Sequence, residues 1–478
     1  MSPKCDGFST PKHPKWVHNK HRNSDFNAVL LGGIAIIRSA FFVFSALLIL
    51  TPFRAQAAIS EVTVNDDLRA AIADLQPGDE LLLNAGTYVM SSRFNIVVVG
   101  DASRPIVIRA KDGADVLISM NTGNQNILEV MDSRHLELRN LRFTGGSHGI
   151  RLMNSDFITI EGCEIFETGD VAISANSGGT YEGLVIRSNH IHNTNDTGEG
   201  MYLGCNNDAC RVQNSLIEFN YIHHTNGPTV VQGDGIELKE GSSGNIIRHN
   251  VIHDTHYPGI LTYSTRGNGP PNIIEGNLIW NTEDYAIQSA ADSIIRNNII
   301  LSSGIGLQPH QAGSPSNQQV VHNTIIVNGN GIEVRGVSGP VLIANNAVYS
   351  QSGTAIRLIS GNTSLVTLAG NIGAGGLSGG SGGYLNGNGI GSDFINGHFG
   401  GNPPIDLFPA NGSALIGAGS IQSVTQYDFN ESARQGAVDA GAYFYQAGGN
   451  PGWTLSPAFK VLVDNIVIPK PPVNLNTN

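Results

Sequence analysis

The sequence predicts an all-β protein in which short units coil into a parallel β-helix, a solenoid with a short N-terminal capping helix and an irregular C-terminal cap. Two repeated features predict this fold. A small residue followed by an apolar one recurs every 18 to 35 residues, and an Asn recurs at one turn of each unit. Composition agrees, because charged residues make up only 14% of the chain and Gly reaches 59 residues, which suits a turn-rich β protein better than a helical bundle.

Residues 1–57 have the pattern of an export signal. A basic stretch precedes an apolar run from Ala40 to Leu50, and Ala55-Gln56-Ala57 places small residues at a cleavage position. We therefore expect the protein to be secreted or periplasmic, with a membrane contact only if the segment stays uncleaved. This segment holds seven of the 27 basic and two of the 39 acidic residues, so its removal leaves 20 basic and 37 acidic residues and a net charge of −17. Such a charge disfavours nucleic acid as a partner.

The rest of the chain divides into three parts. Residues 58–126 hold the N-terminal cap and first coils: the helical spacing from Asp66 to Leu75 predicts a capping helix, and strands follow at 80–83, 88–90 and 106–109. Residues 127–365 form the β-helix coils. Residues 366–478 form a Gly/Asn-rich C-terminal segment and cap, in which the run from Asp428 to Tyr443 should cover the last coil and the tail from Gly449 should be loosely ordered.

Two types of strand repeat through the coils. The first begins with the small–apolar pairs Gly149-Ile150, Ala172-Ile173, Gly200-Met201, Gly235-Ile236, Gly259-Ile260, Ala286-Ile287, Gly304-Ile305, Gly331-Ile332 and Ala355-Ile356. The second contains an Asn, at Asn189, Asn220, Asn250, Asn277, Asn298, Asn323 and Asn346. We expect these Asn residues to adopt the left-handed conformation of a tight corner and their amides to hydrogen-bond from coil to coil.

The cysteines fit an exported protein. Cys205 and Cys210 bracket a polar insertion, where a disulfide is expected in an oxidising compartment. A metal site at this pair is less favoured, since no second Cys/His pair stands at ligand spacing. Cys163 occupies an interior position of the repeat and should be a buried thiol.

Stacking the coils in register brings acidic residues together. Adjacent strands lie roughly 4.8 Å apart, and alignment on the small–apolar pairs places Glu199 and Asp234 at one position of adjacent coils, with Glu237 facing outward beside them. Three carboxylates on one face repel each other, so we predict that Glu199, Asp234 and Glu237 bind Ca²⁺. The alternative is a solvated polar face with an incidental ion pair.

The same alignment surrounds these carboxylates with groups suited to catalysis and binding. The candidate catalytic residues are Tyr202, Lys239 and Tyr263, together with Arg266 in the following loop. The candidate substrate-binding residues are Gln288, in the outward column of Glu237, and His310, which stands in a separate insertion. A separate outward column contains His192, His223, His253 and Trp280. We expect that column to be a stacked ladder rather than a metal site, because His side chains on a flat sheet point apart; an aromatic wall for sugar rings is the alternative.

The run from Pro77 to Tyr88, the strand from Arg104 to Ala110 and the Asn-turn coils resemble exported right-handed parallel β-helix proteins. Within that group the chain is similar to the chondroitinase B/alginate lyase type of polysaccharide lyase, over residues 62–360 and mostly in scaffold residues. The resemblance implies acidic residues that bind Ca²⁺, which neutralises a uronate carboxylate, with Lys and Arg as base and acid. Glu237 and Lys239 lie near the matching strand, although their spacing departs from the family pattern. Either Arg266 or Arg248, which is also a candidate substrate-binding residue, would be the Arg that the resemblance implies.

These observations predict a monomeric polysaccharide lyase that cleaves a uronate-containing polysaccharide by β-elimination. Lys239 (or one of the two tyrosines) would remove the C5 proton, and Arg266 would stabilise the developing charge. Two other enzymes remain open on this scaffold, a glycoside hydrolase with Asp234 and Glu237 as its acid–base pair and a uronate C5-epimerase. The non-enzymatic alternative is a carbohydrate-binding or adhesion solenoid.

Overall fold

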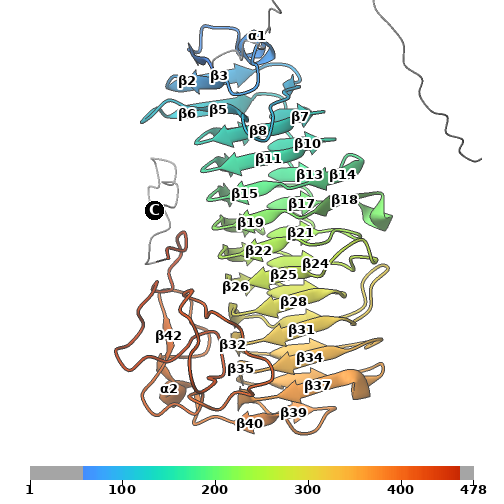
Figure 1. The fold of residues 1–478 in the computed structure, drawn as a ribbon, viewed down its shortest axis with the longest axis vertical. Coiled ribbons are helices and arrows are strands. Elements are labelled where there is room, and N and C mark those ends of the chain that lie inside the picture. The colour runs from blue at the N-terminus through green and yellow to red at the C-terminus, as the bar shows by residue number, and fades with distance from the viewer. Residues whose placement is uncertain (1–56, 463–478) are drawn as a thin grey trace, which may run out of the picture. The chain divides into compact units, whose positions relative to one another are not determined.

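The computed structural model describes residues 57–462, which form a parallel β-helix (Figure 1). Each coil contributes one strand to sheet A, one to sheet B and one to sheet C, and then passes to sheet A of the next coil. Sheets A and B have 13 strands each and sheet C has 12. The predicted all-β solenoid is therefore confirmed. Within residues 57–462, neither of the two short helices has the length and apolarity needed to cross a bilayer.

The strands are short and follow the coils in order. Sheet A contains β1 (Ile59–Val62), β2 (Glu80–Leu83), β5 (Ile106–Ala110), β8 (Arg134–Arg139), β11 (Asp156–Glu161), β15 (Val185–Arg187), β19 (Leu216–Glu218), β22 (Ile246–Arg248), β25 (Asn272–Glu275), β28 (Ser293–Arg296), β31 (Gln318–Val321), β34 (Val341–Ala344) and β37 (Val366–Ala369). Sheet B contains β3 (Gly86–Met90), β6 (Val116–Met120), β9 (Arg142–Gly145), β12 (Glu164–Phe166), β16 (His190–His192), β20 (Tyr221–Thr225), β23 (Val251–Thr255), β26 (Leu278–Thr282), β29 (Ile299–Ser302), β32 (Thr324–Val327), β35 (Ala347–Ser350), β38 (Asn371–Ala374) and β40 (Tyr384–Asn386). Sheet C contains β4 (Asn95–Ile96), β7 (Leu128–Met131), β10 (Ile150–Met153), β13 (Ile173–Ala175), β17 (Met201–Leu203), β21 (Ile236–Leu238), β24 (Ile260–Thr262), β27 (Ile287–Ser289), β30 (Ile305–Leu307), β33 (Ile332–Val334), β36 (Ile356–Leu358) and β39 (Leu377–Ser378).

The core forms because apolar residues of successive coils stack in columns. In sheet C, Ile150 pairs with Ile173, which pairs with Met201, which pairs with Ile236, and all four side chains are fully buried. The residues between them along each strand point outward, as the two-residue period of a strand requires. The register predicted from the small–apolar pairs is thus the register of sheet C, and it fixes which side chains of different coils meet.

The Asn column is confirmed, but its conformational role is not the predicted one. The side-chain amide of each Asn donates to the side-chain oxygen of the next, for example from Asn220 to Asn250 at 2.9 Å and from Asn250 to Asn277 at 3.0 Å, and the ladder extends to Asn371. The left-handed residue is the one before each Asn, such as Phe219 (φ 54°) or His249 (φ 56°). The Asn residues therefore hold the coils together through hydrogen bonds, while their neighbours make the corner.

A short helix packs on the first coils. Helix α1 (Leu68–Ala73) lies within the predicted range, and Asp67 caps it by accepting hydrogen bonds from the backbone N–H groups of Arg69 and Ala70. Leu68 and Ile72 join the main hydrophobic core. Helix α1 therefore covers apolar surface at the N-terminal end, as expected of a cap.

The coils continue past the predicted boundary at residue 365 as far as β40, and residues 387–462 then lie along the side of the coils. The prediction that the run from Asp428 to Tyr443 covers the last coil is therefore wrong. Figure 1 shows this segment, in orange and red, beside β32 and β35; it includes helix α2 (Ile390–Asp393) and the antiparallel pair β41 (Phe394–Asn396) and β42 (Asp406–Pro409). Phe408 and Phe429 share a second hydrophobic cluster with Trp280, Leu301 and Tyr349, which stand on the outer face of sheet B. The segment packs there because this face carries apolar side chains that would otherwise meet water.

The part of the tail that the structure describes is also well packed, contrary to the prediction of loose order from Gly449. Lys460 is fully buried, donates hydrogen bonds to the carbonyl oxygens of Gly276 (2.8 Å) and Phe429 (2.6 Å), and lies 3.1 Å from Nδ1 of His249. These contacts tie the tail to the coils. The predicted export signal in residues 1–56 lies outside the described residues, as do residues 463–478.

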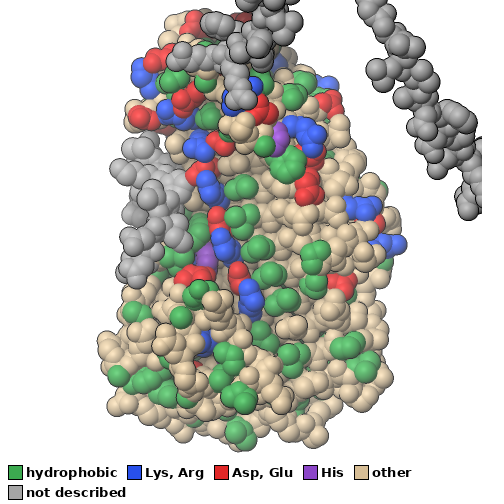
Figure 2. All heavy atoms as spheres, viewed as in Figure 1, with side chains coloured by type: hydrophobic (Ala, Val, Ile, Leu, Met, Phe, Trp, Pro, Cys, Tyr) green, Lys and Arg blue, Asp and Glu red, His purple; other side chains and the backbone are tan. Residues whose placement is uncertain are grey.

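The outer face of sheet A carries alternating acidic and basic side chains, visible as a red and blue stripe in Figure 2. Arg248 pairs with Glu218 at 2.8 Å and Arg296 pairs with Glu275 at 2.6 Å. Such pairs on adjacent strands offset each other's charge on a solvated face. We assign this stripe a structural role.

Candidate active site

Sheet C brings the predicted carboxylates together. Tyr202 on β17 pairs in register with Glu237 on β21, and both point away from the core. Glu199 and Asp234 precede these two strands at equivalent positions. One oxygen from each of Glu199, Asp234 and Glu237 lies within 4.8 Å of the others, and the three residues are at most 2% exposed. The predicted meeting of residues from separate coils is therefore observed.

Four oxygens of this carboxylate cluster (Glu199, Asp234 and Glu237) have no hydrogen-bond partner among the described residues. They are Oε1 of Glu199, both oxygens of Asp234 and Oε2 of Glu237. Thr197 donates a 2.6 Å hydrogen bond to the other oxygen of Glu199. Because unpaired buried carboxylate oxygens are costly, such an arrangement calls for a partner. Clustered oxygens are the ligands that Ca²⁺ prefers, so these residues fit the predicted ion.

Crowding and burial shift the titration of this cluster. Burial raises the pKa of Glu199 to about 7, although the hydrogen bond from Thr197 acts in the opposite direction. Burial, and then the charges of Glu237 and Glu199, raise the pKa of Asp234 well above its usual range. Without a bound metal ion, Glu199 and Asp234 therefore hold protons near neutral pH.

Lys239 is the cation that the chain itself supplies to the cluster. Its Nζ lies 2.7 Å from Oε1 of Glu237 and 3.2 Å from the hydroxyl of Tyr263, and it stands 4.9 Å from the ring centre of Tyr202. Burial by itself lowers the pKa of Lys239, but the charge of Glu237 and the hydrogen bond to it raise the pKa above its ordinary value. Lys239 is consequently protonated in this environment.

Tyr263 connects this ion pair to His310. The Tyr263 hydroxyl donates to Oε1 of Glu237 at 2.9 Å and lies 3.1 Å from Nε2 of His310, and the two rings stack with their centres 4.8 Å apart. Burial, and then the charge of Glu237, raise the pKa of Tyr263. Burial, and then the charge of Lys239, lower the pKa of His310. A protonated phenol next to a neutral imidazole can pass a proton.

A pocket of about 690 Å³ on the outer face of sheet C is lined by Asp234, Glu237, Lys239, Tyr263 and His310, but not by Glu199. The corners before the sheet C strands form one wall, with Gln232 and Tyr257, and the corners after these strands form the other, with Asn206 and Gln311. Gln288, a predicted binding residue, also lines the pocket and accepts a hydrogen bond from Gln308 at 2.9 Å.

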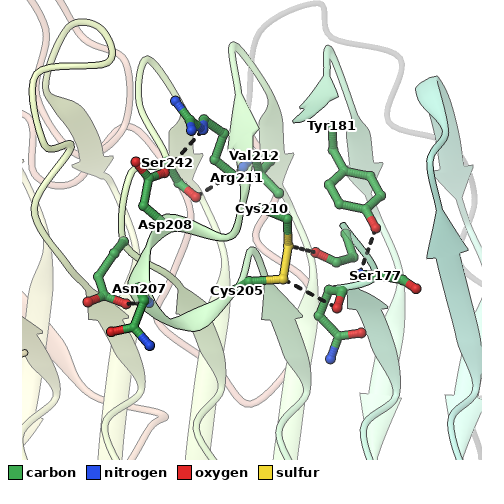
Figure 3. Close-up of a disulfide and its surroundings, with 12 residues drawn as sticks. Ser177, Tyr181, Cys205, Asn207, Asp208, Cys210, Arg211, Val212 and Ser242 are labelled. Atoms are coloured by element: carbon green, nitrogen blue, oxygen red, sulfur yellow. Dashed lines mark hydrogen bonds and ion pairs between the residues drawn. A yellow bond between two sulfur atoms is a disulfide. The ribbon is translucent and has the colours of Figure 1, made fainter. Parts of the chain in front are cut away.

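A disulfide fixes one wall. Cys205 and Cys210 are bonded, as predicted, and close the loop that carries Asn206 and the short helix η1 (Asn206–Asp208). Figure 3 shows Asn207 and Asp208 on this loop. The backbone N–H of Asn207 donates to Glu240 at 2.7 Å, and Asp208 pairs with Arg211 at 3.1 Å. The loop is therefore held at both its base and its tip. Cys163 is a buried free thiol, also as predicted.

Two predicted arginines lie elsewhere. Arg266 is 41% exposed, and its guanidinium lies 3.9 Å from Asp208, outside the residues that line the pocket. Arg248 stands in the stripe on sheet A, where it lines a different pocket. Sequence alone could not place the Arg266 side chain, because Arg266 lies on the loop between β24 and β25, whereas Arg248 lies on a strand of another sheet.

Several residues around the site were missed from the sequence, among them Thr197, Asp170 and Gln308. Thr197 bonds both Glu199 and Asp170, each at 2.6 Å. Gln308 occupies the position three residues after the apolar residue of its coil, which is also the position of Lys239. Extending that column by three coils would have identified Gln308, whereas Asp170 falls one residue outside the alignment.

The second outward column is a stacked ladder, as predicted. Ring centres lie 5.2 Å apart between His192 and His223, 5.0 Å between His223 and His253, and 4.1 Å between His253 and Trp280. His253 and Trp280 are buried. This burial disfavours the alternative of an open aromatic wall for sugars at that end of the ladder.

Comparisons with known proteins agree with this architecture. The family model described as "Right handed beta helix region" matches residues 97–231 and 211–348, which together span more than half of the chain. The chain belongs to this family. The right-handed coiling implied by the resemblance is thereby confirmed.

Individual relatives of the right-handed β-helix chain include pectate lyases. Pectate lyase PEL9 of Emericella nidulans is 24% identical over 196 residues, which are 38% of this chain and 40% of that protein, so the match spans less than half of either. Among solved structures, pectate lyase Pel9A has a TM-score of 0.50 at 14% identity and covers 82% of this chain and 97% of its own. XylC in complex with xylose has a TM-score of 0.55 at 10% identity, with coverages of 82% and 99%. The chain thus shares the fold of polysaccharide lyases.

Proposed function

We propose that this protein is a polysaccharide lyase that cleaves a uronate-containing chain by β-elimination in the pocket on sheet C. The observation that carries the proposal is the carboxylate cluster, whose four unpaired buried oxygens lie beside Lys239 and Tyr263. β-Elimination requires a group that neutralises the uronate carboxylate, a base and a proton donor, and a cation site beside Lys239 and Tyr263 would supply all three. The pectate lyase relatives support the same reaction class.

Glu199, Asp234 and Glu237 would hold Ca²⁺. The ion, when bound, would neutralise a uronate carboxylate and make the adjacent C5 proton more acidic. Lys239 accepts this proton; to do so it must first be neutral, which requires that the charge of Glu237 be offset. As the C5–H bond breaks, a C4–C5 double bond forms and the C4–O bond breaks. Tyr263 donates its proton to the departing oxygen, and His310 lies 3.1 Å away to replenish it.

The assignment replaces the role first expected of Arg266, which lies outside the pocket. A sugar polymer would run along sheet C, with Gln288 and Gln308 as hydrogen-bonding groups two and three coils beyond Glu237. We further propose that the protein acts as a monomer in a secreted or periplasmic setting. The disulfide between Cys205 and Cys210 supports an oxidising compartment.

A glycoside hydrolase is the second candidate, because the raised pKa values of Glu199 and Asp234 give the site carboxylic acids that keep a proton near neutral pH. Oxygens of the three groups lie within 4.8 Å of one another. Inverting hydrolases need about 6.5–9.5 Å between carboxyl groups to admit a water molecule. The cluster therefore suits only a retaining hydrolase with a covalent intermediate.

The test is incubation with pectate, alginate and chondroitin in Ca²⁺ and in excess chelator. A lyase produces an unsaturated uronate that absorbs in the ultraviolet, and this signal should disappear with chelator. New reducing ends without that absorbance would indicate hydrolysis instead, and binding without either product would leave a carbohydrate-binding solenoid.

Variants assign the residues. Glu237→Gln and Lys239→Met should each lower turnover by about 100-fold or more while the fold is retained, because they remove a cation ligand and the base. Arg266→Ala, outside the pocket, is the matched control. Retained turnover in Lys239→Met would show that another group is the base.

A further inference from the structure

Sheet B carries a second group of titratable side chains, on a face other than that of the pocket. Strands β12, β16 and β20 present Ile165, Ile191 and Ile222 to the core. The alternating residues, among them Glu164, His190, His192 and His223, therefore face outward. The sequence prediction followed only the column that contains His192 and missed His190, on the other side of Ile191.

These side chains converge rather than point apart. Nε2 of His192 lies 3.2 Å from Oε1 of Glu164, and Nδ1 of His190 lies 3.6 Å from the same oxygen. The two imidazole rings lean together, with their centres 4.2 Å apart. One ligand atom from each of Glu164, His190 and His192 lies within 4.8 Å of the others. Two neighbouring coils therefore supply two nitrogens and one carboxylate oxygen around a common point.

The remaining polar atom of each of these three residues is held by a neighbour. Arg142 binds Oε2 of Glu164, Asn193 lies 3.2 Å from Nδ1 of His192, and Nε2 of His223 lies 2.8 Å from Nε2 of His190. Proteins that bind metals through His orient each ring by such a bond from its second nitrogen. Arg142 likewise holds Oε2 of Glu164, so that Oε1 is the oxygen that faces the two imidazoles.

The tautomers needed are mutually consistent. If His190 carries its proton on Nε2 and donates it to His223, then Nδ1 of His190 presents a lone pair toward Glu164. His223 accepts on Nε2 and so carries its own proton on Nδ1, which lies 2.5 Å from Nδ1 of His224. Solvent can reach the group, because the side chains of Glu164 and His192 are 12% and 17% exposed.

We propose that Glu164, His190 and His192 form a binding site for a divalent transition metal of the Zn²⁺ class, with His223 as a positioning residue. Two imidazoles and one carboxylate suit Zn²⁺, whereas Ca²⁺ prefers oxygen ligands alone. Three protein ligands leave a fourth position open to water. The metal would cross-link β12 to β16 and so join two coils.

The test uses the untagged full chain in excess Ca²⁺, which occupies oxygen-only sites, and titrates Zn²⁺ against a chromophoric chelator. The expected result is one Zn²⁺ per chain, lost in Glu164→Gln and in His192→Gln. His223→Phe keeps the ring in the stack and should weaken binding by about 10- to 100-fold, the usual effect of removing an orienting group. The matched control is His256→Gln, which removes an exposed His paired with Glu283 at 2.6 Å and should leave the affinity unchanged.

A second measurement covers the case in which a variant fails to fold. Substoichiometric Cu²⁺ bound to the unaltered chain should show nitrogen hyperfine coupling from two imidazoles in its electron paramagnetic resonance spectrum. Absence of that coupling, or Zn²⁺ affinity that is the same in folded His192→Gln and in the unaltered chain, would overturn the proposal.

Discussion

Replacing Lys239 by Met probes the ion pair at the centre of the pocket. The Nζ–Oε1 distance to Glu237 is 2.7 Å, and the two side chains are only 4% and 2% exposed. Exposed pairs contribute about 0.2–1 kcal/mol, whereas removal of one partner from a buried pair costs about 3–5 kcal/mol because the other charge stays buried. We expect a loss of about 4 kcal/mol, because Glu237 is left buried without its partner.

Adding Glu237→Gln to the Lys239→Met variant removes the buried carboxylate charge that Lys239 would otherwise neutralise. The loss of unfolding free energy in the double variant should therefore be about 3 kcal/mol smaller than the sum of the losses in the two single variants. Arg296→Met, with or without Glu275→Gln, is the matched control: that pair has an N–O distance of 2.6 Å, but its arginine side chain is 33% exposed. Its coupling should stay at or below about 1 kcal/mol.

The assay is unfolding by urea in the presence of a chelator, monitored by tryptophan fluorescence. The unfolding free energy is calculated from the urea concentration at the midpoint and an m-value shared by all variants. Adding Ca²⁺ should restore much of the stability lost in Lys239→Met, because the ion supplies the positive charge that the variant lacks. A coupling energy equal to that of the Arg296 control would refute the argument, since it would mean that the Lys239 pair is solvated.

Three further outcomes are expected. Asn250→Ala should cost about 4 kcal/mol in urea unfolding, because its side chain makes four buried hydrogen bonds in the ladder worth about 1 kcal/mol each, whereas Asn388→Ala on the surface should change stability by less than about 0.5 kcal/mol. Burial lowers the pKa of Lys460 from 10.5 to about 7, so between these values the unfolded chain binds a proton that the folded chain does not, and stability rises with pH. Resistance of the C-terminal segment to proteolysis should therefore increase from pH 7 to 9, and Lys460→Met should abolish this increase. Arg248→Ala should leave kcat/KM unchanged in the lyase assay, since its side chain pairs with a carboxylate on sheet A; a tenfold loss would place it in the substrate path.

The sequence was sufficient to predict the β-helix fold and to predict that carboxylates from separate coils lie close together. The small–apolar pairs fix the register of sheet C, and that register alone brings Asp234 next to Glu199 and places Tyr202 beside Glu237. Side chains on loops were not predictable in this way. Arg266 follows a corner whose path depends on the loops around it, so its position relative to the strands gave no guide to where it points.

The sequence does indicate that another part of the chain covers the outer face of sheet B, but this indication is missed if every strand is assumed to alternate apolar and polar residues. Leu278-Ile279-Trp280 and Ile299-Ile300-Leu301 are unbroken apolar runs, typical of strands that are buried on both faces. One face packs in the core and the other meets the C-terminal segment. The sequence alone does not say which segment covers the outer face, because no periodic pattern links residues so far apart.

Coils of 18 to 35 residues share strands of nearly constant length, so the extra residues fall at the corners. The strands that form the coils and the corner loops that form the walls of the pocket are therefore separable parts of this molecule. Exchange of the segment that carries Gln232, or of the one that carries Gln311, would remodel a side of the pocket without disturbing the ladders that close each turn. Evolution, or a protein engineer, can in this way alter what the pocket binds while the scaffold beneath is inherited intact.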